Sequence, residues 1–250
     1  MAYGKEFAKV YDEKWNVWGA KMWPFVFKLA KEYNPGATSW LDLCCGTGAL
    51  IKYVTDREFK GTGLDSSPHQ IKIAESKVPE AEFLVKDMRN FSLSRKFDII
   101  TCTYDSLNYL TEKPDLEKAL QKAASHLAES GVFIFDMNTY EGLQDKWCER
   151  NVLRDPSMSI IIDASFNPKT ALGKCIITGF IKDGSGHKKF KETHIERGYY
   201  STEIEQGLTK TGLSFKKYDG DTFKKPKSRA GRIIYVCKKE KNSSEGDIYA

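Results

Sequence analysis

The residues best suited to bind a ligand lie in a short acidic and glycine-rich segment. Residues 41–48 read Leu-Asp-Leu-Cys-Cys-Gly-Thr-Gly, so that Asp42 precedes Gly46 and Gly48. Glycine lacks a Cβ atom, and a ligand can therefore approach its backbone closely. The carboxylate of Asp42 would repel a pyrophosphate but could bind an amino group, directly or through water. The dinucleotide pattern Gly-x-Gly-x-x-Gly would also need glycine where Ile51 stands, which argues against a pyrophosphate ligand.

Two more acids, Asp65 and Asp87, end apolar runs further along the chain. The carboxylate of Asp65 could accept hydrogen bonds from both hydroxyls of a ribose, with Ser66 as a neighbouring contact. Asp87 would lie near an adenine amino group, while the backbone N–H of Met88 could bond to the ring. A plain turn or helix cap is the alternative role for Asp87. A nucleoside joined to a group that carries an amino function would use all three acids.

These acids need a scaffold that brings the ends of several apolar runs together. Between residues 38 and 140, short apolar runs alternate with helical ones, which is typical of a parallel sheet covered on both faces. The expected strands are 39–43, 61–65, 82–87, 96–105 and 132–138, and the expected helices are 49–57, 69–77 and 116–127. Ligands of such sheets bind at the carboxyl ends of the strands, where the glycine loop and the later acids fall.

The flanking regions follow other patterns. Residues 3–33 contain two helix-like segments, the second over 24–33. Residues 158–199 lack strong helical periodicity and show β-like runs with turn residues between them, which predicts an antiparallel insertion. The elements expected in the second half of the chain are strands at 159–166, 174–182, 194–201, 213–219 and 231–239 and a helix at 202–212.

We therefore expect four parts in the chain. Residues 1–36 would form a helical lid, and residues 37–140 together with 200–239 would form the ligand-binding domain. Residues 141–199 would be a β-rich insertion over the substrate site, and residues 240–250 a mobile polar tail.

The composition is that of one globular domain. The 250 residues are 40% hydrophobic and 29% charged, and the formal net charge is +5. The start has no signal-peptide pattern and no apolar run approaches the roughly 20 residues that span a bilayer, so we expect a soluble cytoplasmic protein without a membrane partner. The six cysteines include no Cys-x-x-Cys pair, so neither a metal site nor a disulfide framework is expected, and Cys102 and Cys237 should be buried.

Positive charge is concentrated in residues 182–241, which hold 16 Lys and Arg residues and 8 Asp and Glu residues. A solvated surface is the simpler interpretation, and a nucleic-acid or other anionic partner is the alternative. His69, His126 and His187 are expected on the surface.

Together, the motifs resemble those of the class I S-adenosylmethionine-dependent methyltransferases. The family's first motif, Asp/Glu-x-Gly-x-Gly-x-Gly, is matched at Asp42, Gly46 and Gly48, with Cys44 in place of the first glycine. Asp65 and Asp87 match the acids of the family's second and third motifs. The resemblance implies a Rossmann-like, seven-stranded, mostly parallel α/β sheet with an antiparallel final strand, plus a small antiparallel β insertion. It makes S-adenosyl-L-methionine the expected cofactor.

Within this family, the chain resembles the small-molecule type with an N-terminal lid and a β insertion. Residues 7–12, Phe-Ala-Lys-Val-Tyr-Asp, are similar to a segment of relatives that N-methylate amino sugars or glycine. Tyr11 would accordingly help to close over the cofactor, unless it is only a core aromatic. The end of the run 97–110, with Tyr104, would face the methyl group. The expected cofactor contacts are Tyr11, Asp42, Cys44, Gly46, Thr47, Gly48, Asp65, Ser66, Asp87, Met88 and Tyr104.

The expected reaction is transfer of the methyl group to a small-molecule acceptor by in-line displacement. An amine is the expected acceptor. The leaving group departs neutral, so the protein mainly aligns the reactants and excludes water. Tyr104, Tyr11 and His194 are the candidate catalytic residues, with a solvated strand position as the alternative for His194. Two other functions stay open: an RNA methyltransferase that uses residues 182–241, and a nicotinamide-dependent oxidoreductase or non-catalytic nucleotide-binding module.

Overall fold

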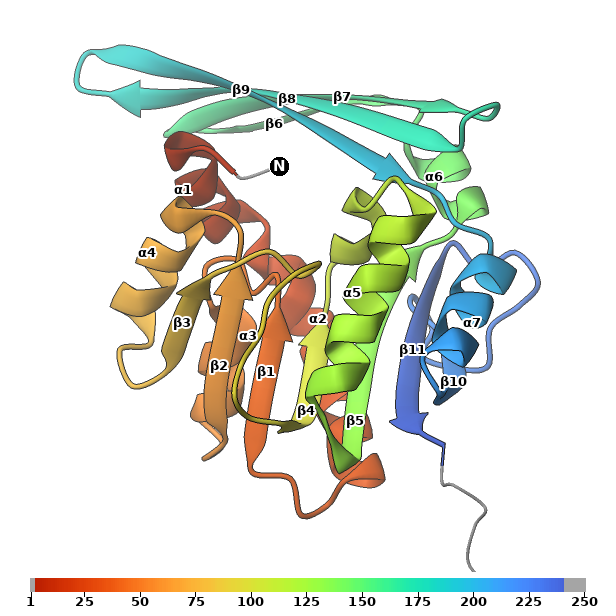
Figure 1. Cartoon of the computed structure of the whole chain (residues 1–250). Coiled ribbons are helices and arrows are strands. Elements are labelled where there is room, and N and C mark those ends of the chain that lie inside the picture. The colour runs from red at the N-terminus through yellow and green to blue at the C-terminus, as the bar shows by residue number, and fades with distance from the viewer. Residues whose placement is uncertain (1–2, 241–250) are drawn as a thin grey trace, which may run out of the picture.

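The computed structural model describes residues 3–240, without the side chains of residues 17–19, and contains two sheets with helices around them (Figure 1). Within this range the larger sheet has seven strands in the order β10-β11-β5-β4-β1-β2-β3. Neighbouring strands pair in parallel except at β11, which is antiparallel to β5 and β10. The bounds are β1 Ser39–Leu43, β2 Lys60–Asp65, β3 Glu82–Val85, β4 Phe97–Cys102, β5 Leu127–Asn138, β10 Leu213–Asp219 and β11 Arg232–Lys239. The predicted Rossmann-like sheet with an antiparallel final strand is confirmed.

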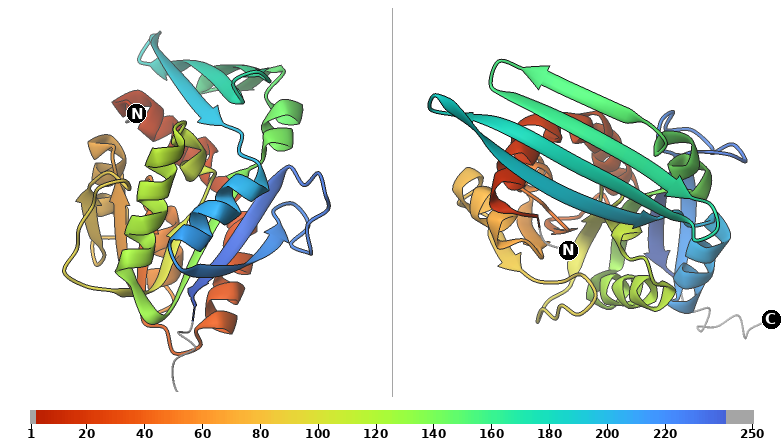
Figure 2. Two further views of the ribbon diagram at one scale, coloured as in Figure 1. Left: turned by 45° about the vertical axis from the view of Figure 1, so that its right-hand side comes forward. Right: turned by 90° about the horizontal axis from the view of Figure 1, so that it is seen from above.

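Helices cover both faces of the larger sheet (Figure 2). Side chains such as Leu120 and Leu208 belong to the buried cluster on one face, and Val26 and Ile51 belong to the cluster on the other. The helices that supply these side chains are α2 Asn16–Tyr33, α3 Ala49–Thr55, α4 Pro68–Lys77, α5 Lys113–His126 and α7 Ser201–Lys210. The strands are thus apolar nearly throughout because helices bury them from both sides.

Helix α2 begins earlier than the sequence pattern suggests. The second helical segment was predicted from Pro24, but α2 starts at Asn16 and contains this proline in its interior. Proline has no N–H to donate and normally interrupts a helix interior. Met22 and Val26 on either side of it are buried in the core, so tertiary packing maintains a helix that local propensity would end.

The second sheet is antiparallel, in the order β6-β7-β8-β9, and lies across the carboxyl ends of the parallel strands (Figures 1 and 2). Its strands are β6 Arg150–Asp155, β7 Met158–Asn167, β8 Leu172–Asp183 and β9 Gly186–Arg197, and α6 Tyr140–Lys146 precedes them. The predicted antiparallel insertion is confirmed, but β6 and α6 were not predicted, because both are short and β6 is largely exposed. The β-like run expected to end in 194–201 is present as β9, but β9 already ends at Arg197, because α7 begins at Ser201.

Helix α1, Lys5–Lys14, lies beneath the second sheet (Figure 1). Phe7 and Val10 form a small buried cluster with Met158 and Ile177 of that sheet. The N-terminal helix and the second sheet therefore share a core, which fixes both above the end of the larger sheet.

Three further expectations concern burial and the termini. Cys102 and Cys237 are buried, as predicted. His126 is not on the surface, because its Nε2 accepts a hydrogen bond of 3.0 Å from the backbone N–H of Leu93 and its ring lies against Phe91. No helix of residues 3–240 is long and apolar enough to cross a membrane. Apart from residue 240, the predicted tail 240–250 lies outside the described residues.

Candidate active site

Two adjoining cavities lie at the carboxyl ends of the parallel strands. The smaller, of about 140 Å³, is lined by the loop after β1, the end of β2 and residues 86–89. The larger, of about 640 Å³, extends from the loop after β4 to the inner face of the second sheet. Tyr3, Tyr11, Tyr104 and Tyr109 line both cavities and so mark the passage between them.

The loop after β1 adopts an unusual backbone conformation. Cys44, Gly46 and Gly48 have φ angles of 57°, 55° and 75°, in the left-handed region. A Cβ at Gly48 would lie 2.9 Å from the Cβ of Ala74 on α4, so glycine permits the close approach of loop and helix. Cys44 takes a conformation that favours glycine, at the place where the family motif has one.

Asp65, at the end of β2, is fixed against this loop. Its Oδ2 accepts a hydrogen bond of 3.1 Å from the backbone N–H of Gly46, and its Oδ1 accepts one of 2.8 Å from that of Ser67. Burial raises the pKa of Asp65, while these N–H groups oppose the rise. The carboxylate lines the smaller cavity beside Ser66 and keeps lone pairs for further donors.

Asp87 and Met88 line the opposite wall of the smaller cavity. The Asp87 carboxylate binds the guanidinium of Arg89, with Nη2 at 2.6 Å, and this ion pair lowers the pKa of Asp87. The side chain therefore remains ionised. The sulfur of Met88 lies 3.6 Å from Sγ of Cys44, so the loop and this wall are in contact.

Asp42 and Thr47 do not line either cavity. Asp42 is 2% exposed and accepts a hydrogen bond of 2.6 Å from the hydroxyl of Thr101, and its burial raises its pKa to about 7. The hydroxyl of Thr47 donates to Asp12 Oδ1 of α1 at 2.6 Å. Asp12 also binds Lys77 of α4, so this acid connects the N-terminal helix to the loop and to α4.

Tyr11 and Tyr104 both line the two cavities beside the loop after β1. The Tyr11 ring is parallel to that of Trp15, with centroids 6.5 Å apart. Tyr104 has a positive φ of 65°, and its backbone N–H donates to Asp136 Oδ1 at 2.7 Å. Its hydroxyl donates to the carbonyl of Trp15 at 2.8 Å, which joins the loop after β4 to the N-terminal helices.

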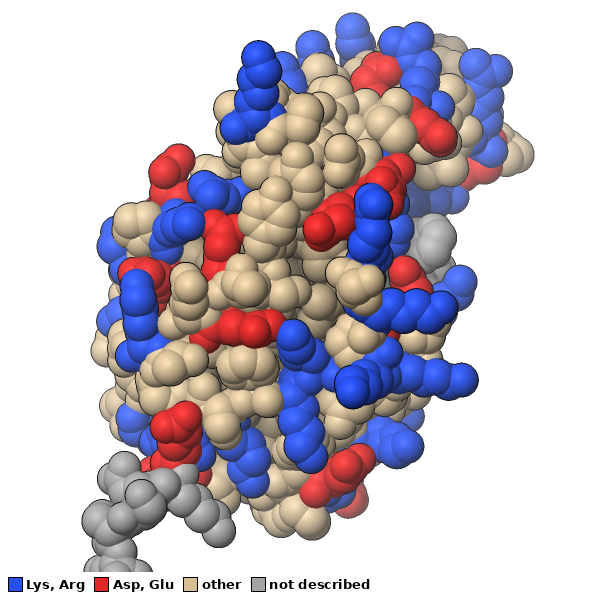
Figure 3. Space-filling view, turned by 90° about the vertical axis from the view of Figure 1, so that its right-hand side faces the viewer, with Lys and Arg blue, Asp and Glu red and all other residues tan. Residues whose placement is uncertain are grey.

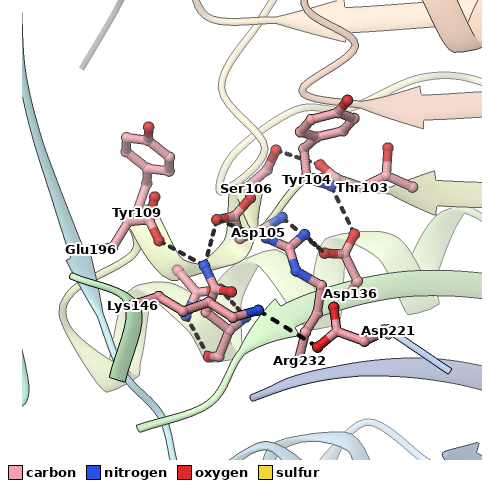
Figure 4. A network of polar contacts seen from close by, with 12 residues as sticks. Thr103, Tyr104, Asp105, Ser106, Tyr109, Asp136, Lys146, Glu196, Asp221 and Arg232 are labelled. Carbon is pink, nitrogen blue, oxygen red and sulfur yellow. Dashed lines mark hydrogen bonds and ion pairs between the residues drawn. The ribbon is translucent and has the colours of Figure 1, made fainter. Parts of the chain in front are cut away.

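A polar network surrounds Arg232 at one wall of the larger cavity (Figure 4). The guanidinium forms ion pairs with Asp136, at the end of β5, and with Asp105, in the loop after β4. The amide of Asn138 donates to Asp105 Oδ2 at 2.5 Å and to Glu196 Oε2 at 3.4 Å. Arg232 was not predicted as a site residue, because nothing in its local sequence connects it to acids almost a hundred residues or more away.

His194 lies on β9, within the lining of the larger cavity. It is 3% exposed, so the alternative of a solvated strand position is wrong. Its Nδ1 and the hydroxyl of Tyr109, in the 3-10 helix η1 Ser106–Tyr109, are 3.0 Å apart and share a hydrogen bond. Burial lowers the pKa of His194 to about 4, so its imidazole is neutral at pH 7.

Comparison with known proteins decides the family. A family profile described as a methyltransferase domain matches residues 41–131. The crystal structure of an S-adenosylmethionine-dependent methyltransferase from Clostridium acetobutylicum is 30% identical, with a TM-score of 0.84, and the match covers 94% of this chain and 98% of that one. The chain belongs to the S-adenosylmethionine-dependent methyltransferases.

Some relatives of this methyltransferase have named acceptors. It is 28% identical to the dTDP-3-amino-3,4,6-trideoxy-α-D-glucopyranose N,N-dimethyltransferase of Streptomyces venezuelae, over 77% of this chain and 82% of the relative. It is 33% identical to the dTDP-4-amino-2,3,4,6-tetradeoxy-D-glucose N,N-dimethyltransferase of Saccharopolyspora spinosa, over 54% and 55% of the two chains. Family membership decides between the two cofactors that the sequence left open in favour of S-adenosylmethionine.

The smaller cavity of the methyltransferase fits parts of this cofactor. The anchored carboxylate of Asp65 has lone pairs for ribose hydroxyls, and the left-handed loop at Gly46 exposes backbone without a Cβ. Met88 offers an apolar surface to a ring. Of the predicted cofactor contacts, the structure brings Tyr11, Cys44, Gly46, Asp65, Ser66, Asp87, Met88 and Tyr104 to the cavity, whereas Asp42, Thr47 and Gly48 do not line it.

Most of the basic residues of 182–241 that the structure describes are exposed, whereas Arg232 lines the larger cavity. In the view of Figure 3, Lys and Arg side chains are spread over the surface with Asp and Glu among them. Within residues 3–240, six of the region's cations form ion pairs: Lys188, Arg197, Lys210, Lys217, Arg232 and Lys239. These ion pairs thus balance part of the region's positive charge.

Proposed function

We propose that this methyltransferase transfers a methyl group to an amino group of a small molecule, with amino sugars as the acceptor class to test first. The observation that carries the proposal is the larger cavity, in which the carboxyls of Asp105 and Glu196 lie beyond the tyrosine passage. Carboxyl groups at such a place suit an amine, which is a cation in water at neutral pH. The relatives named above, which act on amino sugars, support the same class.

The chain's own residues would act by alignment and by exclusion of water. When bound, S-adenosylmethionine supplies an electrophilic methyl group on a positively charged sulfur. Tyr11 and Tyr104 line both cavities, so their rings can enclose a cationic acceptor where it meets the methyl group. We assign these two residues a direct contact with the reactants. His194, neutral at pH 7, is suited to accept a hydrogen bond rather than to hold a proton.

We also infer which parts of the chain cover the site. Helix α1 and its Tyr11 lie over the cofactor loop, which supports a lid function for residues 1–36. Side chains of β7, β8 and β9 line the larger cavity, which supports residues 141–199 as the cover of the acceptor. Residues 37–140 and 200–239 would then form the cofactor-binding domain.

The test is a methyl-transfer assay read by mass spectrometry. The purified protein is incubated with S-adenosylmethionine and dTDP-3-amino-3,6-dideoxy-α-D-glucopyranose, with the N-acetylated sugar as the matched control. We expect methyl groups on the amine and none on the acetamide. Transfer to bulk tRNA, with no transfer to the amino sugar or to glycine, would reject the proposal in favour of an RNA acceptor.

A further inference from the structure

Glu196 is a buried carboxyl with few partners inside the protein. It is 3% exposed and lines the larger cavity, and its side-chain partners are the amide of Asn138, which donates a hydrogen bond of 3.4 Å, and the carboxyl of Asp105. By contrast, Asp136 binds Arg232 and the backbone N–H groups of Tyr104 and residue 105. A buried carboxylate is stable only when donors or a cation surround it, so Glu196 has capacity for a partner from the cavity.

The charges around Glu196 point to the same kind of partner. Arg232 is shared between Asp105 and Asp136 through its two ion pairs. Burial and the nearby Asp105 raise the pKa of Glu196 well above its usual range. Three carboxyls, those of Asp105, Asp136 and Glu196, thus act on the single guanidinium of Arg232. A cation bound beside Glu196 would favour the ionised form of its carboxyl.

An independent observation comes from His194, two residues earlier on β9. Side chains two residues apart on a strand point to the same face, here toward the cavity. Its Nε2 is buried and has no hydrogen-bond partner among the described residues. The tautomer with its proton on Nδ1 donates to the Tyr109 hydroxyl, which lies 3.1 Å from that of Tyr3. The Nε2 lone pair is then available to a donor in the cavity.

We propose that Glu196 and His194 form the binding subsite for the acceptor's ammonium group, and that Glu196 takes the proton that this group must lose. The inference rests on the proposed function, because it assumes an amine acceptor. The ammonium would donate one hydrogen bond to the Glu196 carboxylate and one to His194 Nε2. An N–H bond of the ammonium breaks and an O–H bond forms on Glu196. The freed lone pair on nitrogen then forms the bond to the methyl carbon, and the C–S electron pair stays on sulfur.

The test uses a binding probe that needs no knowledge of the natural acceptor. The probe is an S-adenosylmethionine analogue in which a tertiary amine replaces the sulfonium and carries a 2-aminoethyl arm in place of the methyl group. Its control is the same analogue with a 2-hydroxyethyl arm. Titration calorimetry compares wild type with Glu196→Gln and His194→Phe. The matched protein control is Asp163→Asn, an acid of β7 whose side chain pairs with Arg150 on the exposed side of the sheet.

We expect wild type and Asp163→Asn to prefer the ammonium arm by about tenfold or more, as hydrogen bonds to a charged group allow. Glu196→Gln should bind both analogues equally, and His194→Phe should retain part of the preference. Unchanged S-adenosylhomocysteine binding by the variants shows that they fold. A preference that depends on Glu196 supports the inference even if no amino sugar is methylated. The inference is overturned if Glu196→Gln prefers the ammonium arm as strongly as wild type does. It is also overturned if Glu196→Gln keeps the wild-type kcat and KM with an amino sugar that wild type methylates.

Discussion

At the residue scale, Asp65 combines a fixed position with unused acceptor capacity. Two backbone N–H groups hold its oxygens, and it lines the smaller cavity. We expect Asp65→Asn to weaken S-adenosylhomocysteine binding by about ten- to a hundredfold, because a hydrogen bond to a charged group contributes about 1.5–3 kcal/mol. Titration calorimetry measures this, with Asp56→Asn at the exposed end of α3 as the control. Wild-type affinity in Asp65→Asn would remove this residue from the cofactor site.

Asp42 leads to a prediction about pH and stability. Burial raises its pKa from 3.8 to about 7, so the folded state holds the proton more tightly than the unfolded state. The contribution of Asp42 to stability should therefore fall as the pH rises from about 4 to about 7. Asp42→Asn removes this loss and keeps an oxygen for Thr101. At pH 8 without cofactor, urea unfolding should show the variant more stable by up to about 4 kcal/mol, with little difference near pH 4. A variant less stable than wild type at pH 8 would contradict this.

The residue scale also shows what spacing along the chain can and cannot reveal. Asp65 and Gly46 were predictable because they follow neighbouring parallel strands, whose carboxyl ends lie at the same edge of the sheet. Arg232 was not, since its contact with Asp105 depends on where the antiparallel strand β11 lies in the sheet. Glu196 lies beside His194, but no sequence pattern separates a buried acid on a strand from a solvated one.

At the element scale, the parallel strands and their helices were predictable because apolar runs and helical periodicity alternate without interruption. The start of α2 was not, because burial of Met22 and Val26 overrides the local effect of Pro24. Strand β6 was not predicted, because its residues are mostly exposed and show no apolar alternation. Its hydrogen bonds to β7 hold it in the sheet. Sequence patterns thus revealed the elements with uninterrupted apolar periodicity and missed the start of α2 before Pro24 and the largely exposed strand β6.

The attachment of α1 gives the prediction for this scale. Asp12 binds Thr47 of the cofactor loop and Lys77 of α4. Asp12→Asn should loosen α1 and speed the dissociation of S-adenosylhomocysteine several-fold, because an amide keeps the shape but loses the ion pair and an acceptor. Stopped-flow measurement of the dissociation rate tests this. Glu13→Gln, a neighbouring exposed position on α1, is the control and should dissociate like wild type. Equal rates in the two variants would mean that this acid does not hold the helix over the cofactor.

At the scale of the whole molecule, the second sheet covers the carboxyl ends of the parallel strands and forms a cavity there. Its inner face supplies apolar side chains such as Ile162 and Ile177 together with His194 and Glu196, while α1 closes the other side. The sequence predicted the insertion and singled out His194 in it, but not that Glu196 would be buried on the same strand. The basic residues outside this cavity have no part in the proposed chemistry.

The exposed lysines of β9 therefore give the last prediction. Lys188, Lys189 and Lys191 are the residues through which an RNA acceptor would be bound, if the basic region had that role. Lys188 pairs with Glu6 across an exposed surface, a contact of small energetic effect. Replacing all three by Gln should leave kcat/KM for an amino sugar that wild type methylates within about twofold, since salt screens the effect of exposed charges. The assay is repeated at several salt concentrations, with tRNA as a competitor. A large fall in kcat/KM, or salt-sensitive inhibition by tRNA that the triple variant abolishes, would show that this surface binds a polyanionic acceptor.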